Sequence, residues 1–115
     1  TIDLPIARAE GSAIQRKIDS SGQEARTDYR LLRTRGPLAL LLVTPQTGRT
    51  HQIRLHMAAV GHPLAGDWLY GTEDKVLIAR PALHSVQLSF SHPVTGACLS
   101  FIAPLPGDMK LLLEL

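Results

Sequence analysis

The sequence predicts an α+β fold: a mostly antiparallel sheet, one principal helix at about residues 50–60 and a short C-terminal helix. Apolar residues before position 46 and after position 82 fall mainly in short alternating segments, which is the period of a β-strand. Gly, Pro and Ser separate these segments. Only the stretch from Thr50 has helical spacing with a Gly-Pro stop behind it, so one principal helix is expected.

Four segments before residue 46 have strand patterns. Pro5 lies in the first of them, which favours an edge position because proline cannot donate to a neighbouring strand. The last is a continuous apolar run between turn residues, which predicts a central strand buried on both faces. In chain order, the four segments are residues 2–7, 13–19, 25–35 and 38–44.

The principal helix is expected to begin at Thr50, whose hydroxyl can cap the first turn, and to end at Gly61, before Pro63. Arg54 lies one step from the apolar stripe, so its stem is expected on apolar surface and its guanidinium at the edge of a cleft. The apolar side chains spaced to face the core are Ile53, Met57 and Val60.

Beyond the helix, a loop over residues 72–81 is expected to lead to a β-hairpin and a last short helix. The turn of the hairpin is His92-Pro93-Val94-Thr95-Gly96, and Asp108 caps the helix. The expected elements are strands 83–91 and 97–103 and helix 109–115.

Charge divides the chain into two unlike halves. Residues 1–54 carry nine Lys and Arg against five Asp and Glu, whereas residues 55–115 carry three against five. This favours an anionic partner for the first half, although on charge alone a solvated basic face is the more common explanation. Cys98 is the only cysteine, which fits a reducing cytoplasm, and the longest apolar run, 38–43, is too short to cross a bilayer.

The most polar stretch of chemical interest is Gln46–His56, with two arginines, two histidines, glutamine and threonine. A metal site is not indicated, because His51 and His56 lie about 140° apart on a helix and no cysteine pair supports them. Hydrolase and Walker-type phosphate motifs are absent. Asp67, within Gly-Asp-Trp, is expected to form a turn with its own backbone rather than act in catalysis.

The order of several longer motifs resembles the RluA-type pseudouridine synthases over essentially the whole chain. The central motif is Gly-Arg-Thr-His-Gln-Ile-Arg-Leu-His-Met, at residues 48–57. The other matching stretches are 2–8, 25–29, 61–64, 66–71, 83–84, 92–96 and 103–106.

The resemblance implies isomerisation of uridine to pseudouridine in ribosomal or transfer RNA, in the cytoplasm and without a cofactor or metal. It implies that Arg54 pairs with a catalytic aspartate acting on a flipped-out uridine, while Arg49, His51 and Gln52 line the cleft or touch RNA. The family's H-R-L-D-x-x-T-S-G and K-x-Y motifs do not occur here.

Because those motifs precede the matching segment in the family, residues 1–115 are expected to be the C-terminal portion of a catalytic domain, inactive alone. Arg54 would then await a carboxylate outside this chain. Exposed core and strand edges are expected to cause self-association of such a fragment. The alternative is a non-catalytic RNA-binding module on the same scaffold.

Overall fold

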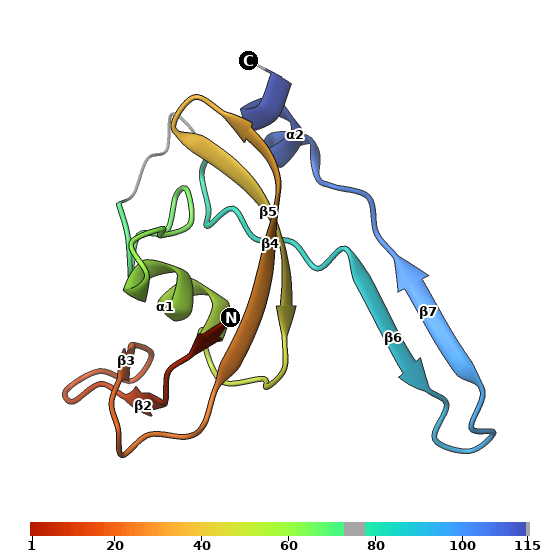
Figure 1. The fold of residues 1–115 in the computed structure, drawn as a ribbon, viewed down its shortest axis with the longest axis horizontal. Helices are drawn as coiled ribbons and strands as arrows, with labels where there is room; N and C mark the ends of the chain where they lie inside the picture. The colour runs from red at the N-terminus through yellow and green to blue at the C-terminus, as the bar shows by residue number, and fades with distance from the viewer. Residues whose placement is uncertain (73–77, 115) are drawn as a thin grey trace.

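The computed structural model describes residues 1–72 and 78–114, and these form an α+β arrangement of three antiparallel sheets and two helices. The largest sheet has the order β1-β4-β5, and β2 pairs with β3 and β6 with β7 (Figure 1). The elements are β1 (Ile2–Asp3), β2 (Ile6–Arg8), β3 (Arg16–Ile18), β4 (Arg26–Arg35), β5 (Leu38–Pro45), α1 (Gln52–Ala59), β6 (Gln87–Ser91), β7 (Cys98–Ile102) and α2 (Gly107–Glu114).

The best-packed core lies where β2, the start of β4 and α1 meet. Ile6, Ala25 and Leu55 form a buried cluster, against which Ile18 and Tyr70 pack. The first predicted strand is divided into β1 and β2, because Leu4 and Pro5 break the regular pairing between them.

Helix α1 confirms the predicted principal helix, but its start and its buried face differ from expectation. His51, not Thr50, is the N-cap, and it makes no capping bond with its side chain. The buried residues are Gln52, Leu55, His56 and Met57, whereas Val60 is exposed. Two of these four are polar, so an apolar stripe alone could not show the true face. Gly61, in the left-handed region at φ 86°, ends the helix, with the His62 amide bonded to the Met57 carbonyl.

The apolar run at 38–44 forms β5, yet the prediction of a central strand buried on both faces is wrong. β5 is an edge strand paired only with β4 in the described part of the chain, and none of its residues is fully buried. The register between β5 and β4 shifts between Leu31 and Arg33 of β4. This shift is a β-bulge, and it changes which side of the sheet the following residues of β4 face.

The C-terminal hairpin and α2 follow the predicted order. β6 is shorter than expected because it begins at Gln87, and the turn at His92–Gly96 joins it to β7. The hairpin extends away from the rest of the molecule (Figure 1). Asp108 lies in the first turn of α2 and binds Arg80 through two hydrogen bonds of 2.9 and 3.0 Å. Most of the loop predicted at 72–81 lies outside the described residues.

Candidate functional site around helix α1

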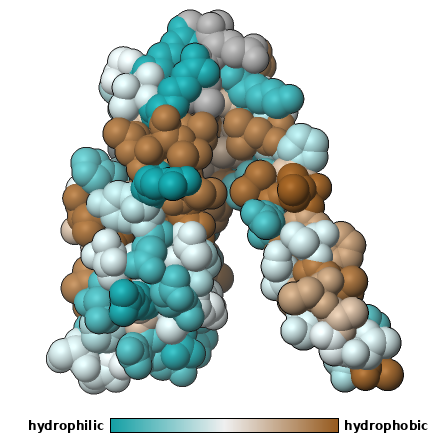
Figure 2. All heavy atoms as spheres, turned by 45° about the vertical axis from the view of Figure 1, so that its right-hand side comes forward, coloured by the Kyte–Doolittle hydropathy of each residue, from teal (hydrophilic) through white to brown (hydrophobic). Residues whose placement is uncertain are grey.

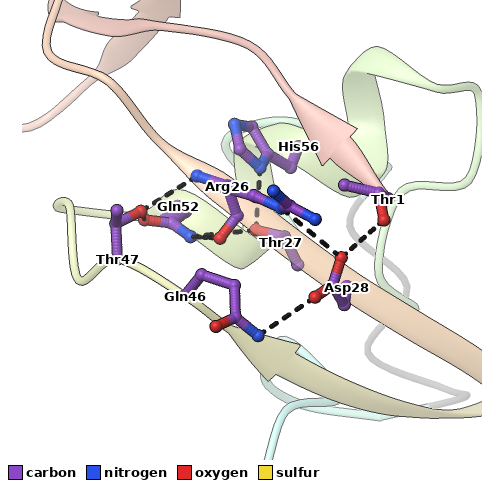
Figure 3. Close-up of polar contacts among 8 residues, drawn as sticks. All are labelled: Thr1, Arg26, Thr27, Asp28, Gln46, Thr47, Gln52 and His56. Atoms are coloured by element: carbon purple, nitrogen blue, oxygen red, sulfur yellow. Dashed lines mark hydrogen bonds and ion pairs between the residues drawn. The ribbon is translucent and has the colours of Figure 1, made fainter.

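The amide of Gln52 connects the loop before α1 to β4 (Figure 3). Its Oε1 accepts hydrogen bonds from the Thr47 hydroxyl at 2.7 Å and the Arg49 amide at 3.0 Å. Its Nε2 donates to the Arg26 carbonyl and to Thr27 Oγ1, both at 2.9 Å. The side chain is only 4% exposed, and these four bonds use its full hydrogen-bonding capacity. Gln52 therefore holds the loop in place from the inside and does not present its amide to a ligand.

His56 continues this network to Leu4, which lies between β1 and β2. Its Nε2 lies 2.8 Å from the Leu4 carbonyl, which can only accept, so Nε2 carries the proton. Its Nδ1 then accepts from the Thr27 hydroxyl at 2.8 Å (Figure 3). Both His56 and Thr27 are fully buried. A satisfied polar chain of this kind fixes the rotation of α1 against β4.

His51 has the only positive φ, 55°, among the described residues other than glycine. This left-handed conformation is uncommon for a side chain with a Cβ and often accompanies functional sites. Nδ1 of His51 lies 2.7 Å from the Tyr70 hydroxyl, and the two rings meet edge to face. Burial, and then the positive charges of Arg54 and Arg16, lower the pKa of His51, while Asp67 opposes them. The ring is therefore held neutral at physiological pH.

Arg54 is held by Asp67 through a two-pronged ion pair. Nε donates to Oδ2 at 3.0 Å and Nη2 to Oδ1 at 2.8 Å. Asp67 is fully buried and the Arg54 side chain is 14% exposed. Arg54 therefore already has a carboxylate partner within this chain, which was not predicted from the sequence, and its expected pairing with a carboxylate outside the chain stays a prediction. Such a fork fixes both the position and the plane of the guanidinium.

Asp67 also forms the turn that the sequence predicts. Its Oδ1 accepts hydrogen bonds from the amides of Leu69 and Tyr70 at 3.1 and 3.2 Å. Burial would raise the pKa of Asp67, but the bonds from Arg54 and these two amides outweigh burial and hold the pKa below its ordinary value. The bond to Asp67 raises the pKa of Arg54. At Gly66, in the left-handed region, any Cβ would collide with the Arg80 carbonyl, which explains why glycine precedes this aspartate.

Two aromatic rings flank the guanidinium of Arg54. Its Cζ lies 5.7 Å from the centre of the Trp68 ring and 5.3 Å from that of Tyr70, both within the range of cation–π attraction. Trp68 is 52% exposed, so about half of a large aromatic side chain is open to solvent beside a fixed cation. Such a surface can stack a planar base.

The structure brings His51 and Arg54 together through Tyr70, whereas Gln52 is bonded to Arg49 and to β4. Arg49 donates from Nε to the Glu24 carbonyl at 2.8 Å. Asp67 as the partner of Arg54, and Trp68 and Tyr70 as its aromatic neighbours, were not predicted from the sequence. The spacing between Arg54 and Asp67 did not indicate that they pair. The one signal was that Asp67 lies between Gly and Trp in an apolar stretch, because a carboxylate that is buried there needs a cationic partner.

Residues 1–72 and 78–114 contain neither a membrane-spanning helix nor a cluster of metal ligands. No helix there has the length and apolar character needed to cross a membrane. In the same residues, no three His, Cys, Asp or Glu side chains gather as metal ligands would.

Comparison with known proteins agrees with this fold and identifies a family. Residues 1–59 match the family model described as RNA pseudouridylate synthase. The chain is 45% identical over 114 residues to the uncharacterized RNA pseudouridine synthase YjbO of Bacillus subtilis, covering 99% of the chain and 40% of that protein. It is 42% identical over 121 residues to ribosomal large subunit pseudouridine synthase D of Nitrosomonas europaea, covering 98% and 35% respectively.

A solved structure, that of human RNA pseudouridylate synthase domain containing 1, has the same fold with a TM-score of 0.72 and 28% identity. The match covers 90% of this chain and 46% of the human one. The predicted α+β class and the resemblance to RluA-type synthases are thereby confirmed. The chain spans less than half the length of each of these relatives.

Proposed function

The chain belongs to the RNA pseudouridylate synthase family, and from this premise we propose that it forms one wall of an active site that isomerises uridine to pseudouridine in ribosomal or transfer RNA. The observation that carries this proposal is the Arg54–Asp67 fork between Trp68 and Tyr70, a fixed cation beside an exposed ring. In this proposal the reacting carboxylate comes from an H-R-L-D segment that residues 1–115 do not contain, so the chain alone is inactive.

Arg54 can serve two carboxylates at once. Asp67 engages Nε and Nη2, and within the described part of the chain Nη1 has no hydrogen-bond partner. A guanidinium has five N–H donors, so the remaining edge is available to a second carboxylate. Asp67 thus acts as a positioning residue, and Arg54 holds the reacting aspartate ionised and aimed at the flipped-out uridine. No cofactor is required for this arrangement.

Trp68 and Arg49 are proposed to contact RNA in different ways. The open ring of Trp68 suits stacking against a base, which alanine replacement shows to be worth about 1–3 kcal/mol in other proteins. Arg49 is half-buried and keeps its two terminal nitrogens without hydrogen-bond partners among the described residues, so it suits phosphate. His51 is proposed to set the position of Tyr70, and Gln52 to support the loop from which Arg49 projects.

A chimera tests this function directly. The chain would replace the matching segment of the Nitrosomonas europaea synthase D, whose remainder supplies the other part of the domain, and pseudouridine would be measured in transcribed RNA. The chimera is expected to form pseudouridine, and Arg54→Lys is expected to lower kcat at least about 100-fold because lysine keeps the charge but loses the fork. The parent synthase is the positive control.

The alternative function, a non-catalytic RNA-binding module, predicts a different outcome. A folded chimera that binds RNA as tightly as the parent yet forms no pseudouridine would support that alternative and overturn the proposed catalysis. Arg33→Lys, an exposed replacement on β4 away from the site, is the matched control and should leave kcat unchanged.

A further inference from the structure

A hollow of about 380 Å³ lies beside the Arg54 site, between the β2–β3 hairpin, the turn at residues 21–23 and the loop before α1. Arg8, Arg16 and Arg49 line it together with the small polar residues Ser21 and Thr50, and no Asp or Glu is among its lining residues. Three arginine side chains line this one hollow, and the Arg16 guanidinium also donates from Nη1 to the Ile14 and Gln15 carbonyls at 3.3 and 3.4 Å. A lining of three cationic side chains with no carboxylate produces a strongly positive potential there.

Two of these arginines lie opposite each other by the register of the strands. Arg8 pairs with Arg16 in the β2–β3 ladder, so their side chains project from the same face of the hairpin. Like charges directly opposite each other destabilise a strand pair. In the part of the chain that the structure describes, neither lies within 4.0 Å of a carboxylate, while nearby Asp19 is already paired with Lys17 at 3.3 Å. An anion in the hollow would remove this repulsion.

Arg49 is fixed in an orientation that suits the same anion. Its Nε bond to the Glu24 carbonyl, at 2.8 Å, restrains the side chain while leaving the terminal nitrogens available. Its backbone amide is bonded to the buried amide of Gln52. The loop carrying Arg49 is therefore positioned before any ligand arrives, which lowers the entropic cost of binding.

The hollow adjoins the Arg54 site through a short chain of contacts. The amide of Arg16 donates to the Tyr70 hydroxyl at 2.9 Å, and that hydroxyl lies 2.7 Å from Nδ1 of His51. The ring of Tyr70 in turn lies beneath the guanidinium of Arg54. A group held by the three arginines would therefore lie next to whatever occupies the Trp68 and Arg54 surface.

We propose that Arg8, Arg16 and Arg49 together bind one phosphate group. Resting on the proposed function, that phosphate is a phosphodiester of the RNA strand next to the target uridine. Arginine suits it because its planar fork donates to two phosphate oxygens at once. The three residues converge on a single anion, which distinguishes this site from a basic surface where each arginine meets its own phosphate.

The convergent geometry predicts a characteristic salt dependence. For single-stranded nucleic acid, log K falls with log salt by about 0.7 for each phosphate neutralised. Replacing all three arginines with glutamine should therefore reduce this slope by about 0.7, and weaken binding of a uridine-containing single-stranded RNA at least about tenfold. A slope reduced by about 2, as three independent phosphate contacts require, would contradict the binding of one shared phosphate by the three arginines. An unchanged slope would overturn the site.

Stability provides a second readout that a structural role could not imitate. Arg16→Gln should raise the Tm of the free chain by about 1–4 °C because it removes the repulsion from Arg8, while RNA affinity falls. A lower Tm would show that Arg16 supports the fold and would contradict the proposal. Arg33→Gln, an exposed change on β4 outside the hollow, is the control and should leave both the slope and the Tm unchanged.

Titration of the full 115-residue chain with inorganic phosphate distinguishes the two sources of the ligand. The Nε–Hε NMR signals of Arg8, Arg16 and Arg49 should shift together with one dissociation constant, while the Arg33 signal stays in place. If phosphate shifts these signals but the three replacements leave RNA binding unchanged, the RNA source is overturned in favour of free phosphate. If neither phosphate nor RNA depends on the three arginines, no such site exists. Catalysis by the chimera is measured separately, so failure of the proposed function and failure of this site give different results.

Discussion

The side chains around α1 and those of the β6–β7 hairpin differ in burial and in hydrogen bonding. Around α1, the polar groups of Gln52, His56, Thr27 and Asp67 are buried and each is bonded to other parts of the chain. Along the hairpin nearly every side chain is exposed, including Ile102 at 76% and Val94 at 87%. Figure 2 shows this hairpin as a separate arm with apolar surface along it.

The difference shows where positional accuracy in this chain comes from. Side chains near α1 are held by long-range bonds that cross 25 to 52 positions of sequence, such as those of Gln52 to Thr27 and His56 to Leu4. The hairpin is held mainly by its own ladder, a bond between Ser89 and Ser100 and a stack of Phe90 on Phe101. Substitutions should therefore affect the fold of the first region and the association behaviour of the second.

The largest effect is expected at the Arg54 fork. Asp67→Asn leaves a buried guanidinium without its counter-charge and should lower the free energy of unfolding by about 3 kcal/mol in denaturant titrations. Because the folded pKa of Asp67 is lowered, this contribution is present above the unfolded pKa near 4 and is lost as the pH falls through the folded value. Asp108→Asn, in the exposed pair with Arg80, should cost about 1 kcal/mol or less. Equal losses would refute the contrast between the two pairs.

A somewhat smaller effect is expected within the buried network. Thr27→Val keeps the shape but leaves Nδ1 of His56 and one proton of Gln52 without partners, at a cost of about 2 kcal/mol. Thr34→Val, an exposed change on the same strand, should stay within about 0.5 kcal/mol. Thermal unfolding of the two variants makes the comparison, and a Thr27→Val protein as stable as wild type would show that the network is dispensable.

For the hairpin, we expect association to change and stability to stay the same. Ile102→Lys places a charge on its exposed apolar surface and should reduce self-association of the chain in light scattering, because such surface favours contact with another copy. The free energy of unfolding should change by about 0.5 kcal/mol or less. A monomeric wild-type chain would contradict the predicted self-association.

The smallest effect is a pH dependence at His51. Its folded pKa is lowered, so the unfolded chain binds more protons just below pH 6.5, and stability is lost as the pH falls through that window. His51→Asn removes the titration and still tolerates the left-handed backbone. The wild-type protein should lose on the order of 0.5 kcal/mol more than this variant between pH 7.5 and 5.5. If the wild-type protein and the His51→Asn variant lost the same stability over this pH range, His51 would contribute nothing to the pH dependence.

Elements governed by local pattern could be predicted from the sequence. The principal helix, its end at Gly61 and the turn at His92–Gly96 depend on neighbouring residues, and the structure contains all three. The position of β5 depends on which strands pair across the molecule. Its apolar run therefore suggested a buried central strand where the structure has an exposed edge.

Only part of the candidate site could be predicted from local sequence patterns. The motif around Arg54 pointed to this stretch as the candidate site, but the partner of Arg54 depends on a turn 13 residues later that folds back onto α1. The buried role of Gln52 was hidden for a similar reason, because the sequence shows a polar residue and not the four partners that enclose it.

A double-mutant cycle between Arg54 and Asp67 tests most directly whether Arg54 is positioned from within this chain. Arg54→Met, Asp67→Asn and the double variant would be compared with wild type by denaturant unfolding. The structure predicts a coupling energy of about 2 kcal/mol, with the double variant losing clearly less than the sum of the single losses. Losses that add within about 0.5 kcal/mol would show that the two side chains act independently and would contradict this account.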